Sequence, residues 1–428
     1  MKALVVGGGG REHALAWKLA ASRSIEKIYV APGNAGTASE FKVRNIPISS
    51  DDIDALARFA EDQNISLTII GPETPLVNGI VDRFKQMNRP CLGPSKNAAR
   101  LEGSKSFAKE FMKKHKIPTA NYQTFDNANK AIRHVEKVGL PLVVKADGLA
   151  SGKGVFITHT LPQAEFAIRQ ILDAHIFGTA GNKVILEDFL TGEEVSFICL
   201  VNNEQILPLA TAQDHKPRDT GDTGPNTGGM GAYSPAPLIT PSLYDQVMET
   251  VIQPTVLGLI QDGIPYTGFL YAGLIIDQQG HPHVLEYNCR SGDPETQIIL
   301  MRLQSDLAEL CCATLAGELR TVKAQWDSRA SLGVVMTAGG YPSAYTTGDA
   351  INGLKGANDL KVKVFHAGTQ IKNNRVVTSG GRVLCVTALG DTVTSAQSTA
   401  YQTVQKLHWN RAYFRSDIGY RAVEREQK

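Results

Sequence analysis

The stretch that decides the fold opens the chain: Ala3-Leu4-Val5-Val6-Gly7-Gly8-Gly9-Gly10-Arg11. A short apolar run ends in glycines and is followed by helical spacing over residues 12–21, which is typical of a strand, a turn and a crossover helix. Further strands are expected at residues 27–30, 67–70 and 90–92, and helices at 52–62 and 77–87. This alternation predicts a parallel α/β sheet in residues 1–103.

Glycine-bearing loops are expected at the carboxyl ends of these strands, where such sheets bind their ligands. They cover residues 8–11, 32–36 and 71–73, and together they predict a rim that binds phosphate or sugar. Arg11 lies at a helix start, where main-chain amides attract anions, so phosphate binding is favoured over a plain tight turn. A dinucleotide-binding motif fails because Glu12 occupies the position of its third glycine.

The pattern changes after residue 103. Helices at 104–115, 128–138 and 163–174 and strands at 142–145, 154–158, 184–186 and 195–201 are expected, then a helix at 241–261, a hairpin at 270–276 and 284–288, and a helix across 294–316. Beyond residue 326 the pattern is mainly β, with strands at 331–336, 362–367, 375–378 and 382–388 and a helix at 393–407. We therefore predict a multidomain α/β and α+β protein divided into residues 1–103, 104–325 (with a lid at about 123–190) and 326–428.

The composition is that of a globular protein. Of the 428 residues, 42% are hydrophobic and 20% charged, and the 44 basic and 42 acidic residues leave a net charge of +2. Nucleic acid is not an expected partner, because the nearest basic cluster, around Lys113 and Lys114, is typical of a solvated helix face. The six cysteines form no C-x-x-C pair, which favours reduced thiols. With no signal peptide and no membrane-spanning run expected, we predict a cytoplasmic location.

Lys145 ends the apolar strand at 142–145 and precedes a glycine-rich turn. A lysine at the inner end of a buried strand needs an anion, although an edge-strand lysine that reaches solvent is equally plausible from this pattern. The run Ala150-Ser151-Gly152-Lys153-Gly154 combines small residues with a cation. It predicts a mobile flap over polyphosphate, whereas a P-loop fails because glycine follows the lysine.

Glu286 and Asn288 form the sharpest pair. They are two residues apart on an expected strand, so both side chains face one side, and Arg290 continues that face. Carboxylate and amide oxygens suit Mg²⁺, which uses few protein ligands together with substrate phosphates. An exposed polar face is disfavoured because Glu286 follows the apolar residues Val284 and Leu285.

The segment 213–237 is rich in glycine, aspartate, threonine and proline and has no helix or strand period. A linker is one interpretation. A loop of this length without its own structure is often functional, and linkers rarely mix charges, asparagine and glycines so densely. We favour a loop that closes over substrate and that includes Asp214, Asn226, Thr227 and Gly228.

These residues resemble the phosphoribosylamine–glycine ligase family of the ATP-grasp superfamily, and the resemblance extends over the whole chain. It is carried by residues 9–15, 31–37, 144–150, 224–234 and 286–290, of which 224–234 is the most specific. The resemblance implies a central ATP-grasp region and a ligase of purine biosynthesis. It would join glycine to 5-phosphoribosylamine through a glycyl phosphate, with ATP as co-substrate and Mg²⁺ (or Mn²⁺) as cofactor.

The resemblance also implies roles for individual residues. Lys105 and Lys145 would hold ATP phosphates, Glu187 and Leu190 would lie along the adenine, and Glu194 would hold the ribose. Glu286 and Asn288 would bind the metal, with a third ligand left open. Phosphoribosylamine would contact Gly10, Arg11, Asn34, Gly36 and the Glu73 loop, while Asp214 would meet the ammonium of glycine and Arg290 its carboxylate. Arg290, Lys145 and Asp214 are the expected catalytic residues.

Two positions depart from the family pattern. Ser291 stands where an aromatic is usual, which is expected to loosen packing behind the metal strand. Pro217 replaces an arginine, with Arg218 one step on, which is expected to change the cation that reaches the substrate.

Alternatives to the glycine ligase are another ATP-grasp carboxylate–amine ligase and a non-catalytic nucleotide sensor. The expected partners are small molecules, and the expected assembly is a monomer or a weak homo-oligomer.

Overall fold

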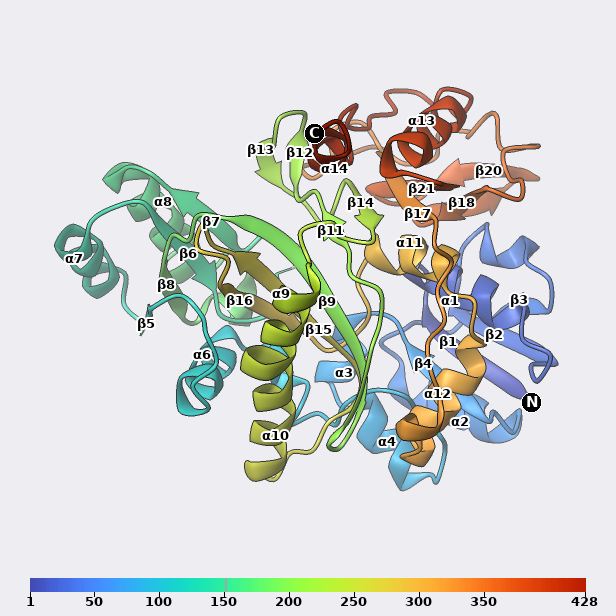
Figure 1. Cartoon of the computed structure of the whole chain (residues 1–428), viewed down its shortest axis with the longest axis horizontal. Coiled ribbons are helices and arrows are strands. Elements are labelled where there is room, and N and C mark those ends of the chain that lie inside the picture. Colours follow the sequence, from blue (N-terminus) through green and yellow to red (C-terminus); the bar gives the residue numbers. More distant parts are fainter. Residues whose placement is uncertain (151) are drawn as a thin grey trace.

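The N-terminal part is a parallel sheet in the order β3-β2-β1-β4, as predicted (Figure 1). The computed structural model describes residues 1–150 and 152–428, so Ser151 of the predicted flap lies outside the described residues. The strands are β1 (Lys2–Gly7), β2 (Lys27–Pro32), β3 (Val43–Asn45) and β4 (Leu67–Ile70), with helices α1 (Gly10–Ala20) and α2 (Ile53–Asp62). The sheet brings the carboxyl ends of β1, β2 and β4 to one edge.

Three details of this part differ from the sequence expectations. The helix expected at 77–87 is divided into α3 (Glu73–Val77) and α4 (Ile80–Gln86). The break falls at Gly79, whose φ of +92° is left-handed and cannot continue a helix. The strand expected at 90–92 is reduced to a single bridge between Ile69 and Leu92, and β3 was not predicted.

A second sheet, in the order β5-β8-β6-β7, projects from one side of the molecule (Figure 1). Its strands are β5 (Tyr122–Phe125), β6 (Leu142–Ala146), β7 (Val155–Thr158) and β8 (Val184–Asp188), and it carries helices α7 (Ala128–Val138) and α8 (Leu161–Leu172). A hydrophobic core confined to residues between Phe125 and Leu186 joins these elements. We call this unit the lid.

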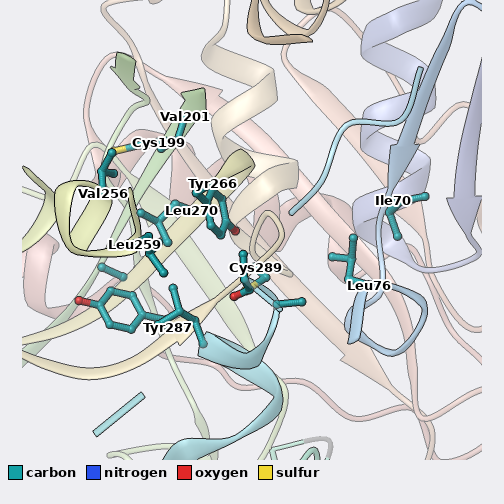
Figure 2. Packing of buried hydrophobic residues seen from close by; sticks show 14 of the residues in the cluster. Ile70, Leu76, Cys199, Val201, Val256, Leu259, Tyr266, Leu270, Tyr287 and Cys289 are labelled. Carbon is teal, nitrogen blue, oxygen red and sulfur yellow. The ribbon is translucent and has the colours of Figure 1, made fainter. Parts of the chain in front are cut away.

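The third sheet, in the order β10-β9-β15-β16, forms the floor beneath the lid. It comprises β9 (Glu193–Asn202), β10 (Gln205–Pro208), β15 (Thr267–Ile276) and β16 (Pro282–Asn288). Helices α5 (Arg100–Gly103), α6 (Lys105–Lys114), α9 (Pro241–Val247) and α10 (Gln253–Gln261) accompany it, α9 and α10 being joined through a π turn. Figure 2 shows Tyr287 and Cys289 among the apolar residues of this core. Because side chains alternate along a strand, Glu286 and Asn288 face the opposite side.

The C-terminal sheet, in the order β11-β14-β17-β21-β18, corrects the expectation for residues 213–237. That segment contains β11 (Gln213–Asp214), β12 (Pro217–Asp219), β13 (Thr223–Asn226) and β14 (Gly231–Ser234). The other strands of the sheet are β17 (Ala330–Thr337), β18 (Val362–His366) and β21 (Arg382–Gly390). β19 (Thr369–Lys372) pairs with β20 (Arg375–Thr378), and β12 pairs with β13, in separate two-stranded sheets. Helices α13 (Val393–Val404) and α14 (Tyr420–Glu426) complete this part. The segment thus contains strands of its own, because β14 pairs with β17 a hundred residues later and β12 pairs with β13.

The helix expected at 294–316 is two helices, α11 (Glu295–Arg302) and α12 (Leu307–Ala316). The chain is extended at Leu303, and Asp306 starts α12 by accepting hydrogen bonds from the amides of Ala308 and Glu309. The domain limits at 103 and 325 stay a prediction, since two cores combine N-terminal and central residues. Among the described residues no helix is long and apolar enough to cross a bilayer, and the six cysteines are free thiols.

Candidate active site

A cavity of about 690 Å³ lies where the lid, the floor sheet and the C-terminal sheet meet. It collects side chains from segments that are far apart in the sequence. The predicted site residues that line it are Arg11, Glu73, Lys105, Lys145, Gly152, Lys153, Glu187, Leu190, Glu194, Asp214, Asn226, Thr227, Gly228, Glu286, Asn288 and Arg290. One cavity therefore brings together the proposed phosphate, metal and substrate groups.

Gly10, Asn34 and Gly36 are not among the lining residues of this cavity. The Asn34 amide donates to the carbonyls of Gly8, at 2.9 Å, and His366, at 2.8 Å. Its oxygen accepts from the amide of Gly36 at 2.8 Å. Asn34 thus holds the first two rim loops together and ties them to the C-terminal sheet.

Lys145 and Glu187 of the lid form a buried triad with Lys109 of α6. Both ammonium groups lie 2.9 Å from the same Glu187 oxygen, so the anion that Lys145 requires is supplied by the protein. Burial lowers the pKa of Lys109 to about 8, against the opposing effect of Glu187. The second Glu187 oxygen is buried and has no hydrogen-bond partner within the described chain. A buried acceptor of this kind favours a ligand that donates a hydrogen bond.

Lys109 was missed by the sequence interpretation, although a signal was available. It follows Lys105 by four residues on α6, so the two side chains share one helix face. The helix is fixed by Ser104, whose hydroxyl accepts from the amide of Phe107 at 3.2 Å. Lys105 is half-buried at the cavity wall, and the loss of water contact there lowers its pKa despite the nearby carboxylate of Glu286.

Glu286 and Asn288 face the cavity from β16 and present oxygen ligands. Burial raises the pKa of Glu286, but Lys216, Lys105 and Lys145 outweigh it and keep the carboxylate ionised. The described residues contain no group of three or more His, Cys, Asp or Glu side chains arranged for a metal. Two oxygen ligands fit a hard divalent cation that completes its shell with phosphate oxygens and water.

Arg290 continues this face and is held by two carboxylates from the N-terminal half. Its guanidinium lies 2.9 Å from Glu102 and 3.3 Å from Glu73. Burial raises the pKa of Glu102 to about 6, against the lowering effect of Arg290. The pair of acids orients Arg290, which lines the cavity.

Asp214 lies on β11, at the start of the segment that joins the C-terminal sheet. Burial raises its pKa to about 8; Lys216 opposes this, whereas Glu295 and Glu194 add to it. Lys216 itself pairs with Glu194 at 2.6 Å. Asp214 therefore sits in an acidic environment that would be relieved by a cationic ligand.

The cavity is also lined by residues that the sequence interpretation did not name, among them Tyr271, Asp293, Glu295, Tyr341 and Arg382. Tyr271 lies on β15, Asp293 and Glu295 lie just before and at the start of α11, and Tyr341 and Arg382 lie in the C-terminal part. No local sequence motif marks these residues. Arg218 does not line the cavity, and its guanidinium pairs with Asp219 at 2.7 Å. Lys216 is therefore the cation that segment 213–237 brings to the cavity wall, and the expected effect of Pro217 stays a prediction.

Ser291 lies beside a small apolar cavity of about 20 Å³, which Leu15, Phe269 and Trp326 help to line. An aromatic side chain at this position would occupy more of that space, consistent with the expected looser packing. The Ser291 carbonyl also accepts from Arg11 at 3.1 Å and from Arg290 at 3.3 Å. The serine therefore still joins the metal strand to the rim.

Comparison with known proteins places these features in a family. Models of the phosphoribosylglycinamide synthetase N domain, ATP-grasp (A) domain and C domain match residues 1–102, 103–296 and 331–421. The chain is 57% identical over 427 residues to the phosphoribosylamine–glycine ligase of Vibrio cholerae, covering 100% of both. It superposes on the crystal structure of that ligase from Thermotoga maritima with a TM-score of 0.83 at 32% identity, covering 98% of this chain and 100% of the other. Biotin carboxylase from Campylobacter jejuni shares the fold, with a TM-score of 0.75 at 15% identity over 96% of this chain and 92% of the other.

Proposed function

The chain belongs to the phosphoribosylglycinamide synthetase family, and on that premise we propose that it is the ATP-dependent ligase that joins glycine to 5-phosphoribosylamine. The products are glycinamide ribonucleotide, ADP and phosphate. The observation that carries the proposal is the single cavity that unites the lysines of the lid, the Glu286–Asn288 pair, Arg290 and Asp214. These are the groups needed to place a nucleotide, a metal and an amino acid side by side.

The reaction requires activation because a carboxylate is a poor electrophile. A glycine carboxylate oxygen attacks the γ-phosphorus of ATP, the bond to the β,γ-bridging oxygen breaks, and ADP and glycyl phosphate result. The amine of phosphoribosylamine then attacks the acyl carbon, loses a proton and expels phosphate. Positioning and charge stabilisation are the main contributions of the protein to such a sequence.

The lysines and the metal pair account for the phosphate end of the site. Lys105, Lys145 and Lys153 offset the charge of the polyphosphate, with Gly152 allowing the flap to approach it. Glu286 and Asn288 would hold Mg²⁺ (or Mn²⁺), which supplies Lewis-acid polarisation of the transferred phosphoryl group when bound. Substrate phosphates provide the ligands that the protein lacks.

The nucleoside end lies against the lid. We assign the adenine to the space beside Leu190, where the unpartnered Glu187 oxygen can accept from an exocyclic amine. Glu194 is assigned to the ribose hydroxyls, with Lys216 holding its carboxylate in place. A purine that presents a carbonyl at the same position would face the carboxylate and be rejected.

The amino-acid and ribosyl ends complete the site. Asp214 receives the ammonium group of glycine, and Arg290 receives its carboxylate. Phosphoribosylamine lies toward Arg11 and Glu73, with Asn226, Thr227 and Gly228 closing over it. Gly10, Asn34 and Gly36 contribute by shaping the rim loops that carry Arg11.

Glycine capture should depend on the ionisation of Asp214. Its pKa of about 8 means that the carboxyl is largely protonated below that pH, and a protonated carboxyl does not pair with an ammonium group. We expect kcat/KM for glycine to rise with pH up to about 8 and then to level. In Asp214→Asn this ascending limb should disappear and the KM for glycine should rise about tenfold or more. Initial rates at varied glycine from about pH 6 to about pH 9 measure both effects; an unchanged ascending limb in the variant would assign it to another group.

The proposed function is tested by release of ADP from purified protein with ATP, Mg²⁺, glycine and freshly generated phosphoribosylamine, with each omitted in turn. Release that requires both glycine and the amine supports the ligase. Turnover with another carboxylate in place of glycine points to a different ligase, and ATP binding without turnover points to a sensor. The cytoplasmic location and the monomer or weak homo-oligomer stay predictions, to be checked by fractionation and light scattering.

A further inference from the structure

We propose that Tyr341 and Arg382 form a clamp on the main chain of Gly228, and that this clamp excludes water from the activated glycine. The Tyr341 hydroxyl accepts from the Gly228 amide at 3.1 Å. The Arg382 guanidinium donates to the Gly228 carbonyl. Both hydrogen-bonding groups of this one residue are therefore held by the C-terminal part of the chain. The inference rests on the proposed ligase function and assigns two positioning residues to it.

The clamped residue is also anchored from its other side. The Thr227 hydroxyl donates to the Lys216 carbonyl at 2.8 Å and accepts from the Gly229 amide at 3.0 Å. Lys216 is two residues from Asp214, so the clamped turn is continuous with the glycine site. The turn at residues 227–229 is thus fixed between the substrate strand and the clamp.

Arg382 is itself oriented by a second set of contacts. Its guanidinium donates to the Asp293 carbonyl at 2.7 Å and pairs with the Asp293 carboxylate at 3.2 Å. Burial acts to raise the pKa of Asp293, but Arg382 and Arg11 outweigh it and hold that pKa below its usual range. An ionised, buried Asp293 therefore keeps the guanidinium in a single position against Gly228.

The flap meets the clamp at the same residue. A Cβ atom added at Gly152 would lie 3.4 Å from the Thr227 carbonyl oxygen and 3.9 Å from the Gly228 nitrogen. A Cβ added at Gly228 would lie 3.1 Å from the Arg382 guanidinium carbon. Glycine at both positions lets the flap, the loop and the clamp come into contact at the wall of the cavity.

The consequence concerns the fate of glycyl phosphate. If water reaches it, water adds to the acyl carbon, phosphate leaves and glycine is regenerated, so that ATP is converted to ADP and phosphate without ligation. A fixed loop keeps this water out while phosphoribosylamine attacks. The clamp should therefore act on the ratio of ligated product to ADP, and much less on ATP binding.

The test compares Tyr341→Phe with Tyr29→Phe. Each removes one hydroxyl that makes a hydrogen bond, 3.1 Å to Gly228 and 3.0 Å to Gln63 respectively, but Tyr29 lies in the N-terminal sheet away from the cavity. For Tyr341→Phe we expect the ratio of glycinamide ribonucleotide to ADP to fall about fivefold, the effect of one ordinary hydrogen bond. Arg382→Lys, which keeps the charge but loses the planar fork, should lower the ratio about tenfold or more. The KM for ATP should stay within about twofold in both.

Each outcome decides a different point. Wild-type protein and Tyr29→Phe that release ADP only with both substrates, at a one-to-one ratio, establish the ligase as the reference. If wild-type protein forms no ligated product, the proposed function fails irrespective of the clamp. Thermal unfolding checks that Tyr341→Phe and Arg382→Lys are folded. If wild-type protein gives a one-to-one ratio of product to ADP and both folded variants give the same ratio as Tyr29→Phe, the clamp is overturned.

Discussion

Glu286→Ala is expected to abolish ligation while leaving the fold intact. The carboxylate faces a cavity in which Lys216, Lys105 and Lys145 surround it, and it is one of two side chains on β16 that offer oxygen to a metal. Removing it takes away a metal ligand and leaves the lysines to repel one another. Loss of transition-state charge stabilisation on this scale should lower kcat by roughly a thousandfold or more. The core behind the strand, formed by Tyr287 and Cys289, is untouched (Figure 2).

The measurement is steady-state turnover together with ATP binding in the presence and absence of Mg²⁺. Wild-type protein should bind ATP more tightly with Mg²⁺, and Glu286→Ala should lose that difference. Glu204→Ala is a matched control, because this carboxylate is exposed and its ion pair within the described chain is with Arg320 at 3.4 Å. Surface pairs of this kind contribute little, so the control should keep wild-type turnover. Near-normal turnover in Glu286→Ala would overturn the metal assignment.

The strands and motifs that depend on local pattern could be predicted from the sequence. The metal pair was predictable because alternation along 284–288 places Glu286 and Asn288 on one face and Tyr287 on the other. The parallel N-terminal sheet was predictable because strands and helices alternate with short turns. In these cases the neighbours in the sequence also decide the neighbours in space.

Within 213–237, β14 could not be predicted because its stability comes from a distant partner, whereas β12 and β13 pair with each other. β14 spans only Gly231–Ser234, and its register is fixed by β17 at residues 331–334. A short, glycine-rich strand has no period of its own to detect. The same reason hides Tyr341 and Arg382, which reach the cavity only after the C-terminal sheet has taken in β11 and β14.

Asn34 shows a different limit. Its position after β2, in a glycine-rich loop, is typical both of a ligand-binding asparagine and of one that organises a turn. The structure uses its side chain for hydrogen bonds to Gly8, Gly36 and His366. Sequence pattern alone does not separate these uses, because the accepting carbonyls lie in the loop after β1 and at the end of β18.

Arg290→Met is expected to raise the KM for glycine by about a hundredfold, the loss of roughly 3 kcal/mol from one charge-assisted pair. The same substitution leaves Glu102 and Glu73 without their cation, since they lie 2.9 and 3.3 Å from the guanidinium. Breaking a buried pair from one side costs about 3–5 kcal/mol of stability, so the single variant conflates weak binding with a weakened fold.

A second substitution separates the two effects. Glu102 already has a pKa of about 6 because of burial, and without Arg290 it should take up a proton near neutral pH. The double variant Arg290→Met with Glu102→Gln removes that ionisable group and should recover much of the lost unfolding free energy in urea titrations. Its KM for glycine should remain high, because no cation faces the substrate carboxylate. For Arg290→Lys the KM for glycine should lie between those of the wild-type protein and Arg290→Met, since lysine keeps the charge without the two-point geometry. If the double variant regains both stability and glycine affinity, the role of Arg290 is to stabilise the fold. The glycine carboxylate is then held by another cation of the cavity wall, such as Arg11 or Lys216.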